Sequence, residues 1–409
     1  MAAFEFLNGT AHGPLFAAGV ACLVLLSGGL TLRRQRLKNG GGSKRSVRKV
    51  TPQMSKPTLP VEPDDPDRAE RRAVAQYIAG LMVADEWTAI GDQLVEWEAD
   101  LATTPAGQRF HDIGAKVALS GLQNLIDEAP RDKLADLIEA EGELSHFMDT
   151  YHGARDNHVL SLLAARAHLL LGEASRADHW PDAERKDAWR KMAHHFVKAG
   201  EILADFDALT QMSPLLAEAQ YLQALGSPGG AHKLPELFEA WIDLDPANPG
   251  IYEAHATYLA DTDAVSDEDI LRLADEASAR TEDSLGFGGY ALFFLPLLTT
   301  REGARDLVDI ELFGSAMMDL ASISANQAEA NWAAGRLAAE MEASSEDQAL
   351  VLRDTLFMLI QSSISVIYPR LWPIDQEEVE ALIAEADVLP ELLSEAGFST
   401  SSNKYAAAA

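Results

Sequence analysis

The sequence predicts an all-α protein, namely an irregular tetratricopeptide-like helical-hairpin array that follows one N-terminal transmembrane helix. The chain is rich in Ala, Leu, Glu and Asp, and no segment shows the alternation of apolar and polar residues that is typical of a half-buried strand. Apolar residues recur instead at spacings of three and four, the pattern of a helix with one buried face. One uncharged stretch, residues 14–32, is long enough to cross a bilayer.

The clearest hairpin signals lie in residues 213–261. Ser213 is a good helix N-cap because its hydroxyl can accept a free backbone N–H, and Pro214 follows where a missing N–H costs nothing. Gly226 and the Ser-Pro-Gly-Gly run behind it end this helix, and two more short amphipathic helices follow. Small alanines alternate with Leu, Tyr and Trp on the apolar faces, so neighbouring helices can approach closely and stack as in a solenoid.

The array is expected to be irregular. Comparable helix ends occur at residues 172, 226 and 261, at intervals of 54 and then 35 residues. Only the second interval is close to the 34 residues of a tetratricopeptide unit.

The uncharged segment near the N-terminus predicts a membrane anchor. Residues 14–32 contain 19 residues without Asp, Glu, Lys or Arg, enough to cross a hydrocarbon core of about 30 Å as a helix. A cleaved signal peptide carries positive charge before its apolar run, but residues 1–13 contain no Lys or Arg. A lipoprotein processing site at Cys22 is the competing interpretation; it lacks the positive region, and apolar residues continue past Cys22.

Basic residues directly after this segment predict its orientation. The positive-inside rule keeps them in the cytoplasm, which places residues 1–13 outside and the body of the protein inside. They can also lie against anionic lipid headgroups. The rest of the segment 33–65 is a linker with a glycine run and several prolines, so it is expected to be an extended tether. The membrane-proximal basic residues are Arg33, Arg34, Arg36, Lys38, Lys44, Arg45, Arg48 and Lys49.

The body, residues 66–398, is predicted to be a succession of helices. Asp65 is the expected N-cap of the first helix, and Pro66 is its first residue. Asp375 and Glu378 form a candidate capping box near the end. Gly397 is the expected C-cap of the last helix, and residues 399–409 are expected to be a disordered tail. Beyond the helices of residues 213–261, the predicted helices are 66–82, 85–99, 104–126, 134–151, 158–171, 182–206, 266–278, 290–298, 302–322, 327–341, 347–367 and 375–386.

Charge is distributed unevenly along the chain. The net charge is −31, and the first 50 residues carry eight Lys or Arg against one Glu, which leaves −38 on residues 51–409. A surface this acidic repels nucleic acid phosphates, so no nucleic acid partner is expected. The single cysteine, Cys22, excludes an intramolecular disulfide and a cysteine-based metal site.

Five segments carry a family resemblance through their order and spacing. They are VADEWTAIGDQLVEWEADLATTPAGQRF (83–110), HVLSLLAARAHLLLGE (158–173), SPLLAEAQYLQALG (213–226), LFEAWIDLDPANPGIYEAHATYLAD (237–261) and GGYALFF (288–294). Together they resemble a bacterial helical family with tetratricopeptide-like hairpins that is known only as a domain of unknown function, over about residues 73–298. The family has no assigned chemistry, so the resemblance implies the helical-hairpin fold and no functional residue. The membrane anchor and the tether depart from the soluble body of that family.

One cluster has the spacing of metal ligands. Glu143 and His146 lie three residues apart on a predicted helix, so they share a face, and His152 follows on the same helix. A di-metal carboxylate bundle needs a second such pair and further glutamates, and the chain contains no second Glu-x-x-His. A polar outward face is the simpler interpretation. We therefore expect no resident metal or other cofactor, and a metal-dependent enzyme built on these residues is the alternative.

Aromatic residues are the candidate anchors for a protein partner. Trp180 and Trp189 lie in a polar context, and Trp241 and Tyr252 lie in the best-formed hairpin. No nucleophile elbow, phosphate loop or dinucleotide fingerprint is present, so no catalytic residue is expected. The sequence thus predicts a non-enzymatic scaffold for protein–protein interaction, anchored once in a bacterial inner membrane with its helical domain in the cytoplasm. Display of the same scaffold in the periplasm is the second alternative.

Overall fold

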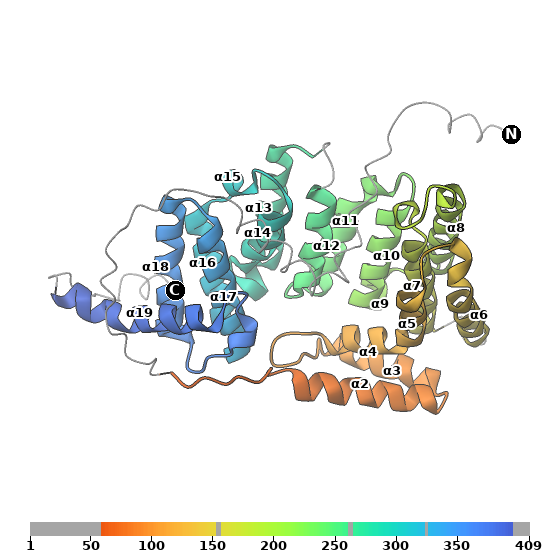
Figure 1. Cartoon of the computed structure of the whole chain (residues 1–409), viewed down its shortest axis with the longest axis horizontal. Coiled ribbons are helices and arrows are strands. Elements are labelled where there is room, and N and C mark those ends of the chain that lie inside the picture. The colour runs from red at the N-terminus through yellow and green to blue at the C-terminus, as the bar shows by residue number, and fades with distance from the viewer. Residues whose placement is uncertain (1–58, 153–156, 261–264, 324–325, 396–409) are drawn as a thin grey trace.

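The computed structural model describes residues 59–152, 157–260, 265–323 and 326–395 (Figure 1). Within these ranges the protein is all-helical, as the sequence predicts, with 18 α-helices and two isolated β-bridges. Residues 14–32, the basic residues 33–49 and the tail 399–409 lie outside the described ranges. Among the helices that the structure does describe, none combines the length and the apolar character needed to cross a bilayer.

The first half of the body contains nine helices and two short 3-10 turns. They are α2 (Arg68–Val83), α3 (Trp87–Ala99), α4 (Phe110–Ala118), α5 (Ser120–Glu128), η4 (Leu134–Leu137), α6 (Ile138–His152), α7 (His158–Ala174), η5 (Ala177–His179), α8 (Arg185–Leu203), α9 (Ala208–Gln211) and α10 (Pro214–Gly226).

The second half of the described chain is also a succession of helices and short 3-10 turns. Its elements are η6 (Gly230–Lys233), α11 (Leu234–Leu244), α12 (Pro249–Ala260), α13 (Asp267–Leu285), α14 (Gly288–Thr300), α15 (Ala304–Leu307), α16 (Ile310–Ile323), α17 (Gln327–Ala343), α18 (Glu346–Ser363), η7 (Pro369–Leu371) and α19 (Gln376–Glu395).

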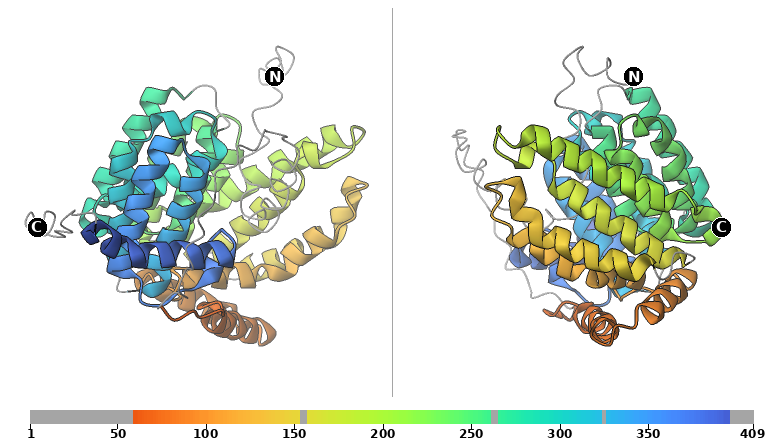
Figure 2. Two further views of the ribbon diagram at one scale, coloured as in Figure 1. Left: turned by 60° about the vertical axis from the view of Figure 1, so that its left-hand side comes forward. Right: turned by 90° about the vertical axis from the view of Figure 1, so that its right-hand side faces the viewer.

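Neighbouring helices stack side by side along the chain. Helix α7 packs on α8, α13 on α14 and α17 on α18, and the next helices join these pairs, because α10 touches α7 and α8 while α14 touches α12 and α16. Figures 1 and 2 show that the row of helices curves, and in Figure 1 α2 to α4 lie along its lower side. Gly226 illustrates how closely the helices approach, since a Cβ there would stand 1.8 Å from the Phe196 ring on α8.

The beginning and the end of the described body meet. Glu62 donates its backbone N–H to the Ile367 carbonyl at 2.8 Å, and the Ile367 N–H is donated to the Pro60 carbonyl at 2.9 Å. The Arg370 Nε also donates to the Pro63 carbonyl at 3.0 Å. Figure 1 shows this extended stretch running from the start of α2 to the C-terminal helices. The row of helices is therefore closed by contacts between its two ends.

Several predicted helix limits are correct and others are wrong. The Ser213 Oγ accepts the Leu216 N–H at 3.2 Å, and Pro214 is the first residue of α10, as predicted. The predicted helix 104–126 is wrong in its first part, because α4 begins only at Phe110. The Thr104 Oγ1 donates instead to Asp67 at 2.8 Å, and Gly107 adopts a positive φ of 82° that turns the chain. The predicted helix 302–322 is two helices, α15 and α16.

Candidate functional site

A cavity of about 890 Å³ lies inside the curve, where segments from both halves of the body converge. Its wall is formed by residues 65–71, α4, α10, α11, α12, α17 and η7. In Figure 1, α4 lies below α10 and α12, and the side-chain bond from Asn248 to Asp112 at 3.3 Å joins the two layers. The wall combines charged and aromatic side chains. They include Lys116, Glu218, Trp241, Glu253, Trp332 and Arg370.

Helix α4 presents a polar side to the cavity because its other side is packed against α3. A Cβ at Gly114 would come within 2.7 Å of Leu94 and 2.9 Å of Trp97, so only glycine lets α4 approach α3 this closely. Asp112 and Lys116 then line the cavity. The position of both charged groups is thus fixed by the packing of the opposite face.

A buried ion pair holds the loop before α4 against the loop between α11 and α12. Arg109 donates from Nε to the Asp245 carboxylate at 2.9 Å and from Nη2 to its other oxygen, and Nη1 donates to the Leu101 carbonyl at 2.7 Å. Asp245 is fully buried, and burial raises the pKa of its carboxyl while the Arg109 hydrogen bond opposes that rise. Such a two-pronged guanidinium–carboxylate contact fixes geometry as well as charge. It makes one side of the cavity rigid.

Two further carboxylates are buried, namely Glu218, which lines the cavity, and Glu98 on α3. Glu218 on α10 pairs with Arg166 on α7 at 2.9 Å, and burial raises the Glu218 pKa. Glu98 at the end of α3 accepts the Ser213 hydroxyl at 2.7 Å and the Leu215 N–H at 2.9 Å. Burial raises the pKa of Glu98 to about 7, against the lowering effect of these two hydrogen bonds. Both carboxylates therefore lie in a poorly solvated environment, where charge interactions are strong.

Two charged groups on the wall are available to a ligand. Within the described residues, neither Lys116 nor Glu253 forms an ion pair closer than 4.0 Å. Burial raises the Glu253 pKa, and the positive charges of Arg336 and Lys116 oppose the rise. The Arg336 guanidinium lies 5.8 Å from the centre of the Trp332 ring. A cation, an anion and an indole therefore face one space, which suits a ligand that carries both charges beside an apolar group.

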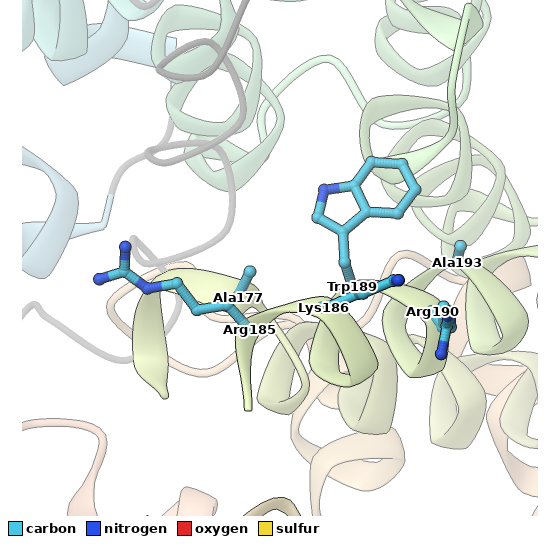
Figure 3. Close-up of a pocket in the computed structure, with 6 residues that line it drawn as sticks. All are labelled: Ala177, Arg185, Lys186, Trp189, Arg190 and Ala193. Atoms are coloured by element: carbon cyan, nitrogen blue, oxygen red, sulfur yellow. The ribbon is translucent and has the colours of Figure 1, made fainter. Parts of the chain in front are cut away.

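The four predicted anchor residues do not form one site. Trp241 borders the cavity, although its side chain is only 4% exposed. Tyr252 is buried, and its hydroxyl donates to the Pro246 carbonyl at 2.8 Å. Trp180 is also buried, and its Nε1 donates to the Ala174 carbonyl at 3.1 Å. Only Trp189 is exposed, at 44%. It lies apart, on α8, in a second hollow (Figure 3).

The candidate metal ligands named from the sequence lie on α6. Glu143, His146 and His152 are all exposed. Among the residues that the structure describes, no three His, Cys, Asp or Glu side chains converge in a way that could hold an ion. The exposure of the three side chains is what a polar outward face predicts.

The histidines on the apolar faces pack within the core. The His255 ring stacks on Phe238 at 4.0 Å, and its Nδ1 lies 3.0 Å from the Tyr221 hydroxyl. His168 and His195 face each other with their Nδ1 atoms 3.0 Å apart. Burial lowers the pKa of these three rings, to about 4 for His168 and about 3 for the other two. The three rings are therefore neutral near pH 7, which is the form expected of histidines that pack in a core.

The sequence did not predict the cavity residues Lys116, Glu218 and Glu253. One signal for Glu218 was present, since it interrupts an otherwise apolar helix, and a buried carboxylate requires a partner charge. Lys116 lies on α4 and Glu253 on α12, and no regular spacing in the sequence relates the two residues. No family model matches this chain, and neither the curated proteins nor the solved structures yield a match.

Proposed function

We propose that this chain is a scaffold for protein–protein interaction and that its central cavity receives a segment of the partner protein. The observation that carries the proposal is the convergence of Lys116, Glu253 and Trp332 on one cavity of about 890 Å³. A volume of this order accommodates a few side chains of a bound segment. The segment that fits best carries one acidic and one basic residue beside an apolar side chain.

The array that forms the cavity is best described as irregular tetratricopeptide-like hairpins. Pairwise stacking of α7 on α8, α13 on α14 and α17 on α18 supports this proposal, as does the joining of successive pairs by the next helix. The resemblance of residues 73–298 to the bacterial helical family of unknown function agrees with it. Concave faces of such arrays are the surfaces on which they bind partners.

We also propose that the scaffold is held at a bacterial inner membrane, with residues 14–32 in the bilayer and the helical body in the cytoplasm. The support is the uncharged segment followed by the basic residues from Arg33 to Lys49. A reporter fused after residue 409 tests the orientation. Activity of a cytoplasmic reporter is expected, and activity of a periplasmic reporter alone would place the body outside.

Site-specific crosslinking tests the cavity. A photoreactive amino acid at Ala254, which lines the cavity, is expected to crosslink one defined partner in cells. Lys116→Glu should lower the yield at least about tenfold, because it places an anion beside Glu253 and removes the cation that the partner meets. Lys233→Glu makes the same charge change at an exposed position outside the cavity wall and should leave the yield unchanged. Equal yields from native protein and Lys116→Glu would refute the proposal.

A further inference from the structure

A second surface, on the outer face of α8, stands out by its exposed aromatic side chain. The inner face of this helix is buried through Ala188, Met192 and Phe196. The outer face carries Trp189, which is 44% exposed, and Val197, which is 54% exposed. Both are large apolar side chains with about half of their surface exposed to water, and they lie eight residues apart along the helix.

A hollow of about 570 Å³ surrounds the tryptophan. Its lining residues are Ala177, Arg185, Lys186, Trp189, Arg190 and Ala193, and Figure 3 shows the indole standing away from the helix. The seven tryptophans all lie in the described part of the chain, and Trp189 alone among them is exposed. The exposed indole therefore has a shaped apolar floor and a rim of cations.

The rim of this hollow carries basic side chains, although the chain as a whole is acidic. Three cations rim the hollow, on a body in which residues 51–409 carry −38. Arg185 pairs with Asp182 at 3.0 Å and Arg190 with Asp187 at 2.7 Å, but all four side chains are more than half exposed. Exposed pairs of this kind are weak and can be exchanged for a partner's carboxylate. Lys186 has no ion pair within 4.0 Å among the described residues.

We propose that this face of α8 docks a short acidic segment of a partner protein that inserts an apolar side chain against Trp189. The charges of the rim require acidic residues, and the hollow beside the indole requires an apolar one. A short segment is favoured over an anionic lipid surface because a flat bilayer would also face the acidic residues that surround the patch. A peptide that stays within the screening length of about 8 Å interacts mainly with the local cations.

Selection from a random peptide display library on the purified full-length chain tests this proposal. Peptides with two or more acidic residues flanking an aromatic or aliphatic residue are expected to be enriched. Their binding should weaken at least about tenfold in Trp189→Ala and again in Lys186→Glu, and it should fall as salt is raised. Arg272→Glu, at a 60% exposed position on α13, is the matched charge control and should bind normally. Because the replaced side chains are exposed, the helical content should not change.

Three results would overturn the proposal. One is enrichment of peptides without acidic bias, or of peptides that bind Trp189→Ala as well as the native chain. The second is quenching of tryptophan fluorescence by brominated phosphatidylserine vesicles that disappears in Trp189→Phe, since this would assign the face to lipid. The third is self-association that Trp189→Ala abolishes, which would assign the face to a second copy. Lys116→Glu should retain peptide binding, so failure of the cavity proposal and failure of this one are distinguishable.

Discussion

At the scale of single residues, the buried carboxylate of Glu98 links stability to pH. Its pKa is about 7 in the folded protein, above the ordinary value of 4.5, because burial disfavours the charged form. The folded state therefore binds the proton more tightly than the unfolded state. Stability falls as pH rises from about 4.5 through about 7, by on the order of 3 kcal/mol from this group.

Glu98→Gln is expected to remove this loss. The amide oxygen can accept the Ser213 and Leu215 donors that the carboxylate accepts now. Above pH 7 the variant should be more stable than the native chain by about 1–3 kcal/mol, and below pH 5 the two should agree within about 0.5 kcal/mol. Urea unfolding at pH 4.5 and pH 8 measures both differences. Glu98→Ala, which loses the acceptor, should be destabilised at either pH, and equal curves for Gln and Glu would contradict the prediction.

Asn331 on α17 is a second residue whose removal has a defined cost. Its Nδ2 donates to the Gln327 and Val366 carbonyls, and its Oδ1 accepts the Tyr368 N–H at 2.9 Å and the Trp372 Nε1 at 3.0 Å. Asn331→Leu leaves these groups without their partner and should cost about 3 kcal/mol. Faster hydrogen exchange in residues 366–372 is the expected signature. Asn124→Leu on the exposed face of α5 should change stability by no more than about 0.5 kcal/mol.

At the scale of helices, the approach of α14 to α13 depends on Gly289. A Cβ at this position would stand 2.1 Å from the Thr281 Oγ1 and 2.8 Å from the Ala277 carbonyl oxygen, which belongs to the backbone and cannot swing aside. Gly289→Ala should therefore destabilise the protein by about 1–3 kcal/mol. Gly142→Ala provides the contrast: nothing lies within 4 Å of its Cβ, and a helical alanine is favoured by about 0.5–1 kcal/mol. Thermal unfolding of the two variants should shift in opposite directions.

Helix limits show which signals a sequence contains. The cap at Ser213 was predictable because the hydroxyl, the N–H that it accepts and Pro214 lie within four residues. The start of α4 was not predictable, since Thr104 uses its hydroxyl for Asp67, which lies 37 residues away. The cavity also depends on contacts between residues that are distant in the sequence. The Arg109–Asp245 pair spans 136 residues, and no periodicity in the chain records such a contact.

At the scale of the whole molecule, the closure between residues 60–63 and 367–370 turns a curved row of helices into an enclosed one. Arg370 and Leu371 line the cavity from the C-terminal end, and Asp65 and Arg71 line it from the N-terminal end. The shape of the cavity therefore depends on a contact between segments about three hundred residues apart. Any ligand that touches both ends binds the closed form better and stabilises it.

Glu62→Pro tests this closure with a change at an exposed position. Proline has no N–H, so the variant loses the bond to the Ile367 carbonyl, at an expected cost of about 0.5–1.5 kcal/mol. Glu62→Ala keeps the N–H and isolates the effect of the side chain. Hydrogen exchange at residues 366–372 should accelerate in the proline variant and stay native in the alanine variant. Because Arg370 is held through the neighbouring Pro63 carbonyl, crosslinking from Ala254 should also weaken in the proline variant alone. Native crosslinking together with faster exchange would show that the cavity keeps its shape without the closure.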